Sequence, residues 1–230
     1  MTEASPPPFT GFPPAATKFF KALAVNQNSA WFAEHKTEYE QSVKAPLVAL
    51  VEAVTQRLST TALPLIGDPK RSIFRINRDI RFSADKRPYK TNASAVISRD
   101  GSKTSPGLIY FQFGAAEILV AAGFYMPMPA DLQRLRAGMV RDPQGWLAIR
   151  KSLKKQGLTL TTQGALVRLP KGFESSPPEI HDDLRMKSWA VTKSVPLGIA
   201  RNAELVDAIA WLALASADLL EFGWSALEAV

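Results

Sequence analysis

The spacing of apolar residues changes along the chain, and this change restricts the possible folds more than any other feature. Residues 47–58 place leucine and valine every three or four positions, which is the spacing of a helix that buries one face. Residues 108–124 instead hold two short aliphatic and aromatic runs around a turn sequence, as antiparallel strands do. Helical spacing then returns toward the C-terminus. The chain therefore has to pack helices against strands.

The expected elements follow from this spacing and from the turn and cap residues between them. We predict helices at 15–23, 30–43, 46–58, 130–139, 144–156, 179–184 and 203–222. We predict strands at 93–98, 108–113, 118–124, 158–162, 165–169 and 188–195. Two of the strand pairs are joined at hairpin length, so the fold class is α+β: an antiparallel β-meander or sheet flanked by N-terminal and C-terminal helices.

The length of 230 residues allows one large domain or two small ones. Residues 1–8 contain three consecutive prolines and are predicted to form a flexible leader. No linker, repeat or low-complexity tract divides the remainder. We therefore expect a single α+β domain over residues 9–230.

Several classes of protein are excluded or disfavoured by composition. The chain has no cysteine, which removes disulfides, thiolate nucleophiles and cysteine-ligated metals, and weakly favours a reducing compartment. Residues 1–12 lack the basic start and apolar stretch of a signal peptide. The most apolar run, Ala208 to Leu220, is too short to cross a bilayer. We expect a soluble, cytoplasmic protein with no membrane partner.

The net charge of +7 comes from two short segments. Residues 70–90 hold eight basic and two acidic side chains, and residues 134–155 hold seven and one. Brought together, the two segments would form a patch that attracts anions. For residues 134–155 we favour a simpler interpretation, the solvated outer face of a helix.

Residues 74–92, which read FRINRDIRFSADKRPYKTN, carry the strongest chemical signal. On a strand, Arg75, Asn77, Asp79 and Arg81 share one face, because side chains alternate. The other face is apolar except for Arg78, and an unpaired buried guanidinium would be costly. Either Arg78 pairs with an acid elsewhere, or a turn breaks the alternation and directs it outward.

The stretch from Ser83 to Asn92 is too polar for a core and presents cations around Pro88. Arginine forks suit carboxylate or phosphate oxygens, and lysine adds a point charge. Three interpretations remain open: an anion-binding site, a structural ion-pair network with Asp79 and Asp85, or a solvated loop. Neighbouring cations should lower the pKa of both aspartates, which suits orienting an arginine or holding a metal better than general-base catalysis.

Common catalytic and cofactor motifs are missing from the sequence. We find no phosphate-binding loop, no dinucleotide fingerprint and no serine nucleophile elbow. His35 lies in a helical row with Trp31 and Tyr39, so it is interpreted as a packing residue. His181 with its two following aspartates is only a weak metal motif. We therefore expect neither a cofactor nor a metal.

The 74–92 stretch resembles the hallmark of a widespread microbial family, domain-of-unknown-function family 2461. Four further runs are similar in order: Asn28–Phe32, Gly123–Arg136, Leu169–Phe173 and Met186–Trp189. The resemblance covers about residues 9–222 and implies one full-length domain with a shared site, but no particular reaction. The matching hallmark positions are Arg75, Asn77, Arg78, Asp79, Arg81, Phe82, Asp85, Lys86, Pro88, Tyr89 and Lys90.

The leading hypothesis is a protein that binds an anionic, phosphate- or carboxylate-bearing small molecule. In it Arg75 and Arg81 clamp the anion, Asp79 orients them and Tyr89 contacts the rest of the ligand. The alternatives are a non-enzymatic nucleic-acid-binding protein, or an interaction module with a structural Arg/Asp network. Catalysis stays open, with Asp79 and Asp85 as weak candidates, and so does the oligomeric state. The candidate ligand-binding residues are Arg75, Asn77, Arg78, Arg81, Lys86, Tyr89, Lys90, Arg136 and Lys171.

Overall fold

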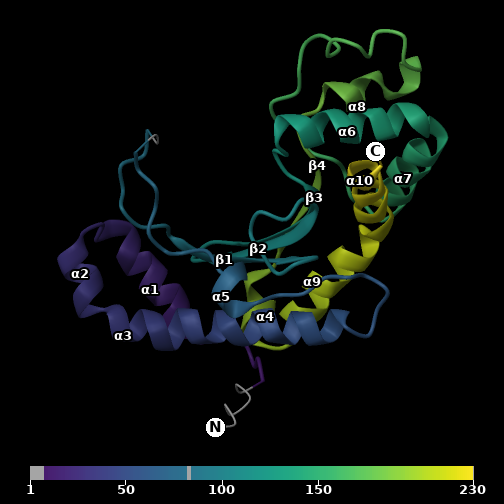
Figure 1. The fold of residues 1–230 in the computed structure, drawn as a ribbon. Coiled ribbons are helices and arrows are strands. Elements are labelled where there is room, and N and C mark those ends of the chain that lie inside the picture. Colours follow the sequence, from purple (N-terminus) through teal and green to yellow (C-terminus); the bar gives the residue numbers. More distant parts are fainter. Residues whose placement is uncertain (1–7, 82–83, 230) are drawn as a thin grey trace. The chain divides into compact units, whose positions relative to one another are not determined.

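The chain folds into helices and one antiparallel sheet, in a computed structural model that describes residues 8–81 and 84–229. Helices precede the sheet, lie between its third and fourth strands, and follow it (Figure 1). This arrangement confirms the α+β class. The sheet contains β1 (Asn92–Ser98), β2 (Leu108–Gly114), β3 (Ile118–Phe124) and β4 (Trp189–Val195), in that spatial order.

The described residues form two compact units, and each is described by itself. The first contains the residues up to Ser105, Tyr110–Val120 and Ser194–Ala210. The second contains Pro106–Ile109, Ala121–Lys193 and the residues from Trp211 onward. The single domain expected over residues 9–230 stays a prediction. The leader expected at residues 1–8 falls, except for Pro8, outside the described residues.

The N-terminal helices follow the predicted boundaries only in part. They are α1 (Pro14–Val25), α2 (Ser29–Glu34), α3 (Lys36–Tyr39), the π-helical turn η1 (Glu40–Lys44) and α4 (Ala45–Leu58). The single helix expected at 30–43 is therefore wrong. The chain leaves helical geometry at His35, and the wider η1 turn comes just before Pro46, which has no N–H to continue the regular hydrogen bonding.

Apolar side chains of α1 and α4 form the core of the first unit. Phe19, Phe20 and Leu50 are each at most 1% exposed. Phe12 stacks on Phe113 of β2, with ring centroids 4.2 Å apart and planes 3° from parallel. This contact ties the segment before α1 to the sheet. The first unit also holds α5 (Pro69–Ser72), the 3₁₀ helix η3 (Leu197–Arg201) and the start of α9 (Glu204–Ala215).

Both outer strands of the sheet carry additional backbone pairs. Ile73 and Ile66 form antiparallel bridges to Ala95 and Ser98 of β1. Leu160 forms an antiparallel bridge to Val191 of β4. This single bridge is all that remains, among the described residues, of the hairpin expected at 158–162 and 165–169, so that prediction is wrong. Val167 is 95% exposed, and its stretch therefore buries no apolar face that would hold it in a sheet.

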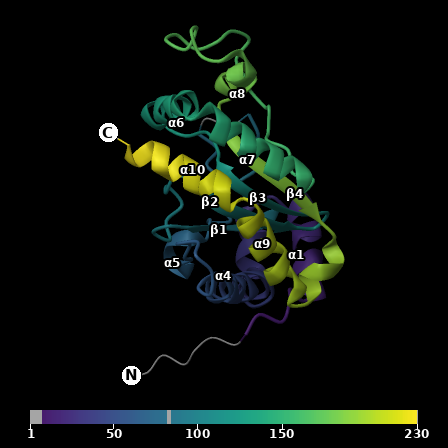
Figure 2. The ribbon, with the colours of Figure 1, turned by 90° about the vertical axis from the view of Figure 1, so that its right-hand side faces the viewer.

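Helices of the second unit pack against one another (Figure 2). They include α6 (Pro129–Arg141), α7 (Pro143–Lys155), η2 (Pro178–Ile180), α8 (His181–Arg185) and α10 (Ala217–Glu228). The α10 helix approaches α6 where Gly138 faces Ala226, and a side chain at Gly138 would come within 2.6 Å of the alanine methyl. The single helix expected at 203–222 is wrong, because the chain breaks at Ser216 (φ −106°) between α9 and α10.

Candidate functional site

The basic segment found in the sequence lies between α5 and β1 of the first unit, where Figure 1 shows a long loop. Its two ends pair as a short antiparallel ribbon. The Arg78 N–H donates to the Pro88 carbonyl at 2.8 Å, and the Lys90 N–H donates to the Ile76 carbonyl, also at 2.8 Å. Nearer the sheet, the Phe74 N–H donates to the Ser94 carbonyl at 3.0 Å. Phe82 and Ser83, at the turn, lie outside the described residues.

Pairing fixes which side chains share a face. Arg75, Asn77 and Asp79 are exposed, whereas Ile76 is buried and Arg78 is half-buried. The even-numbered face carries a cavity of about 300 Å³, within the size range of small-molecule sites. Its lining consists of Phe74, Arg78, Lys90, Asn92, Ser94 and Tyr110.

Arg78 is paired with an acid, which was the first of the two alternatives that the sequence left open. Its Nη1 donates to Asp85 Oδ2 at 2.7 Å. Arg87 holds the same carboxylate, with Nη2 at 2.7 Å from Oδ2 and Nε at 2.9 Å from Oδ1. These contacts, led by Arg87, keep the pKa of Asp85 well below its ordinary value, so the carboxylate stays ionised. Arg78 Nε is buried and has no hydrogen-bond partner among the described residues.

Lys90 brings a second cation to the cavity. Its Nζ lies 5.1 Å from the centroid of the Phe74 ring, a cation–π distance. Within the described part of the chain this ammonium forms no hydrogen bond or ion pair. Burial lowers the pKa of Lys90, and the charges of Arg78, Arg75 and Lys103 lower it further. An anion beside Nζ would offset the repulsion from these three cations.

Neutral polar groups complete the lining. The Tyr110 hydroxyl, on β2, donates to Gln112 Oε1 at 2.9 Å. Burial raises the pKa of Tyr110, partly offset by a hydrogen bond with Ser94, so the phenol stays protonated near neutral pH. Ser94 is 3% exposed. The cavity therefore combines two cations with hydroxyl and amide groups, and no acidic residue in the described part of the chain lines it.

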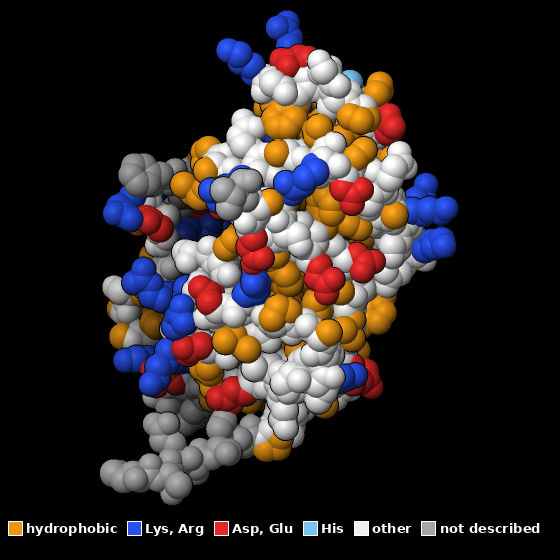
Figure 3. All heavy atoms as spheres, turned by 45° about the vertical axis from the view of Figure 1, so that its right-hand side comes forward, with side chains coloured by type: hydrophobic (Ala, Val, Ile, Leu, Met, Phe, Trp, Pro, Cys, Tyr) orange, Lys and Arg blue, Asp and Glu red, His pale blue; other side chains and the backbone are white. Residues whose placement is uncertain are grey.

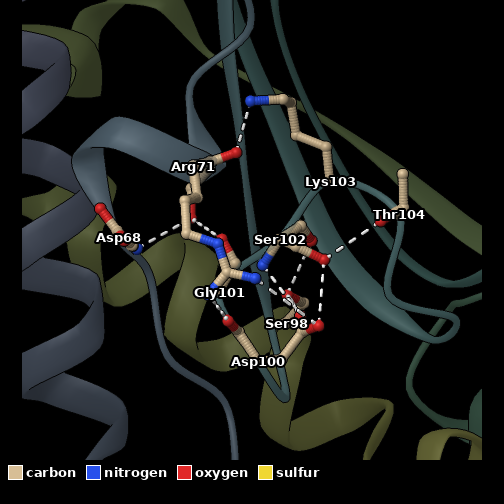
Figure 4. A network of polar contacts seen from close by, with 9 residues as sticks. Asp68, Arg71, Ser98, Asp100, Gly101, Ser102, Lys103 and Thr104 are labelled. Atoms are coloured by element: carbon tan, nitrogen blue, oxygen red, sulfur yellow. Dashed lines mark hydrogen bonds and ion pairs between the residues drawn. The ribbon is translucent and has the colours of Figure 1, made fainter.

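A polar network beside the cavity positions Lys103 (Figure 4). Asp100 accepts hydrogen bonds from the Ser102 N–H at 2.9 Å and the Ser102 hydroxyl at 3.1 Å. Arg71 Nη1 donates to the Asp100 carbonyl at 2.9 Å. Lys103 Nζ in turn donates to the carbonyls of Arg71 and Ile73, and lies 5.8 Å from the Phe74 ring centroid. A third cation is thus held near the ring against which Lys90 lies.

Cations farther along the ribbon are already engaged. Arg81 binds Asp79 through Nε at 3.0 Å and Nη2 at 2.7 Å. Lys86 Nζ donates to the Ile80 carbonyl at 2.9 Å. Arg75 is exposed on the face opposite the cavity residues. The pair of arginines expected to clamp an anion, Arg75 and Arg81, therefore does not line the cavity.

The Tyr89 side chain packs into the first unit. It is 6% exposed, and its ring stacks on Phe32 of α2 with centroids 4.5 Å apart and planes 16° from parallel. Its N–H donates to Gln27 Oε1 at 3.1 Å. The ring thus anchors the ribbon to the N-terminal helices.

The two candidates outside the basic segment belong to the second unit. Arg136 is 3% exposed, and it donates through Nε to the Leu184 carbonyl at 2.8 Å and through Nη2 to the Met186 carbonyl at 3.0 Å. Burial lowers its pKa. This pattern is that of a structural arginine. Lys171 is exposed on a loop. The basic segments 70–90 and 134–155 thus fall in different units.

Four cavity residues were not among the candidates from the sequence: Phe74, Asn92, Ser94 and Tyr110. The alternation that places Phe74 and Arg78 on one face also extends across the ribbon to the even-numbered positions 90, 92 and 94. That signal could have found Asn92 and Ser94. Tyr110 gave no local signal, because only the pairing of β2 with β1 brings it to the cavity.

Charges on the face shown in Figure 3 are mixed, with acidic side chains placed among the basic ones. No group of three or more potential metal-ligating residues occurs within residues 8–81 and 84–229. In the same part of the chain, no helix has the length and apolar character to cross a membrane.

The fold is of the α+β class, and the first unit carries a cavity lined by two cationic side chains. Residues 15–222 match the family described as "Conserved hypothetical protein (DUF2461)", and the chain belongs to that family. The match covers most of the 230 residues, as the sequence resemblance implied. No curated protein and no solved structure gives a significant match.

Proposed function

We propose that the first unit binds a small anionic ligand, bearing a phosphate or carboxylate group, in the cavity beside Phe74. One observation carries the proposal: Arg78 and Lys90, from opposite strands of the ribbon, both line a cavity whose lining includes no acidic side chain from residues 8–81 and 84–229. Among the described residues, Arg78 Nε is buried without a hydrogen-bond partner, and the Lys90 ammonium lies over the Phe74 ring.

The chemistry of the two cations suits an oxyanion. A guanidinium offers several coplanar donors, and one of its nitrogens can bind Asp85 while another binds a ligand. An ammonium adds a compact charge. Asn92, Ser94 and Tyr110 provide neutral groups for the remainder of a small molecule, and the Phe74 ring provides an apolar wall.

Binding would also relieve a cost present in the free protein. The lowered pKa of Lys90 indicates that its charged form is disfavoured by burial and by neighbouring cations. An anion stabilises that charged form, so ligand binding and protonation of Lys90 favour each other. We expect proton uptake on binding when the pH is near the pKa of Lys90 in the free protein.

The test is a thermal-shift titration with inorganic phosphate, a phosphate monoester and a small carboxylate. A ligand at about 100 times its Kd adds about 2.7 kcal/mol of stability, and each kcal/mol corresponds to about 2–4 °C for a chain of this size. The variants Arg78→Met and Lys90→Met are expected to abolish the shift. Arg81→Met and Lys86→Met, on the same ribbon but outside the cavity, are matched controls that should keep it.

Equal shifts in Arg78→Met and Arg81→Met would contradict the proposal. So would a panel in which no anion shifts the melting temperature of the unaltered chain.

A second candidate is the structural Arg/Asp network, and three ion pairs of the ribbon favour it. Arg81 pairs with Asp79, and Asp85 pairs with both Arg78 and Arg87. On this alternative, the arginine variants lower stability and no small anion restores it. Nucleic-acid binding stays a prediction, which an oligonucleotide titration tests through the decline of log K with log[salt]. The cytoplasmic location stays a prediction too.

A further inference from the structure

Lys90 is an unusual amine within its unit. It lines a cavity, lies over the Phe74 ring, and forms no hydrogen bond or ion pair among the described residues. Lys86, on the same ribbon, is instead exposed and donates to the Ile80 carbonyl. Lys103 is held by two carbonyl oxygens. Of these three lysines, only Lys90 presents an unengaged amine to the cavity.

We propose that Lys90 is a nucleophilic amine, and that the ligand of the cavity is a small carbonyl compound whose carboxylate or phosphate group is held by Arg78 while its carbonyl carbon forms an imine with Lys90 Nζ. This inference rests on the proposed function, because it needs an anion in the same cavity. It adds a covalent step and narrows the ligand class to aldehydes and ketones that carry an anion, such as 2-oxo acids or sugar phosphates.

The covalent step is balanced without any further reactant. The lone pair of the neutral amine forms a bond to the carbonyl carbon, and the carbonyl π electrons move to the oxygen, which takes up a proton. The nitrogen loses a proton, giving a neutral carbinolamine. The carbinolamine then loses its hydroxyl group and the remaining nitrogen proton as water, leaving a C=N bond. Nothing is oxidised or reduced.

The surroundings of Lys90 favour the neutral amine that this step requires. Burial disfavours the ammonium form, and three cations add repulsion: Arg78, Arg75 and Lys103. Proximity to another cation and removal from water are the two known means of activating a lysine. A ligand anion paired with Arg78 raises the charged fraction of Lys90, and the carbonyl carbon reacts with the remaining neutral fraction, which burial and the other two cations maintain.

Groups beside Lys90 suit the remaining proton transfers. The Tyr110 phenol stays protonated, because burial raises its pKa, and Ser94 supplies a second hydroxyl in the same cavity. The cavity of about 300 Å³ accommodates a compound of a few carbon atoms with its anionic group.

The experiment traps the imine by reduction. The full chain is incubated near neutral pH with sodium cyanoborohydride and either pyruvate or dihydroxyacetone phosphate, which distinguish the carboxylate from the phosphate class. Intact mass spectrometry counts the adducts, and peptide mapping locates them. We expect one dominant adduct, at Lys90, with at least one probe. Its rate should level off at a pH below the ordinary lysine pKa of 10.5.

Two variants separate covalent reactivity from binding and folding. Lys90→Arg keeps a cation, so it should retain a phosphate-induced thermal shift while losing the adduct. Lys86→Met removes an exposed amine from the same ribbon and should leave the adduct at Lys90 unchanged.

The possible failures are distinguishable. An Arg78-dependent phosphate shift without any adduct at Lys90 overturns this inference and leaves the proposed function standing. Labelling of Lys86 as fast as Lys90 also overturns it, because the reaction is then ordinary surface amine chemistry. The absence of both a shift and an adduct overturns the inference and the proposed function together.

Discussion

Tyr89 offers a direct test of whether the ribbon is held by packing or by a ligand. The sequence analysis predicted that Tyr89 contacts the rest of a bound ligand, a role open to its hydroxyl group, whereas the structure stacks its ring on Phe32 and leaves the residue 6% exposed. These two roles depend on different parts of the side chain. Removing the hydroxyl and removing the ring therefore have different consequences.

The size of the effect follows from the burial. Truncating a buried aromatic side chain to alanine costs about 3–5 kcal/mol, so Tyr89→Ala should lower the melting temperature by about 6–20 °C. Tyr89→Phe keeps the ring and its stacking on Phe32. The conservative variant should therefore change stability by less than about 0.5 kcal/mol and leave phosphate binding unchanged.

Urea unfolding of both variants measures their stability, and phosphate titration measures their ligand binding. Phe32→Ala provides a partner variant, and the double variant should lose less than the sum of the single losses, by about 0.5–1.5 kcal/mol for a stacked aromatic pair. The reasoning is refuted if Tyr89→Phe keeps full stability but weakens phosphate binding, because the hydroxyl would then contact the ligand.

Three further predictions concern charge and backbone geometry. The pKa of Asp85 is lowered from its ordinary 3.8, so its contribution to stability is present above that value and is lost as the pH falls below it. Urea unfolding at pH values across this range should show that Asp85→Asn loses less stability on acidification than the unaltered chain does. Phosphate binding should weaken in the alkaline range as Lys90, whose pKa is lowered from 10.5, loses its proton. Titration calorimetry should show a flatter pH profile for Lys90→Arg, because the guanidinium keeps its charge. Gly123 has φ +125°, and a Cβ atom there would lie 2.2 Å from the Trp189 carbonyl oxygen. Backbone strain alone costs about 1–3 kcal/mol, so Gly123→Ala should lower the free energy of unfolding by more than that. A lower melting temperature measures this loss. An unchanged melting temperature would refute the last prediction.

Local spacing predicted much of the fold. Helices α1 and α4 and strands β1 to β3 lie close to their expected positions, because each buries one face that the sequence marks with regular apolar residues. The failures have physical causes. Residues 158–169 have alternating apolar positions, but only Leu160 pairs with a strand of the sheet. The long C-terminal apolar run gives no sign of the break at Ser216.

The site was predicted in part. Composition located the basic segment, and it drew attention to Arg78 as a guanidinium on an otherwise apolar face. Which cations would face a cavity was not predictable, because it depends on the pairing of residues 76–78 with 88–90 and on the position of β2 beside β1. The sequence also could not show that Arg136, although it lies in a basic segment, is buried and donates its hydrogen bonds to backbone carbonyl oxygens.

The bridges on the two outer strands have a consequence for how this protein meets other chains. An open strand edge is a template on which further chains can add, leading to domain exchange or fibrillar aggregates. Ile66 and Ile73 occupy part of that template on β1, and Leu160 occupies part of it on β4. Recruitment of a foreign strand would first have to displace these residues. These short isolated bridges therefore oppose β-pairing between molecules at high protein concentration.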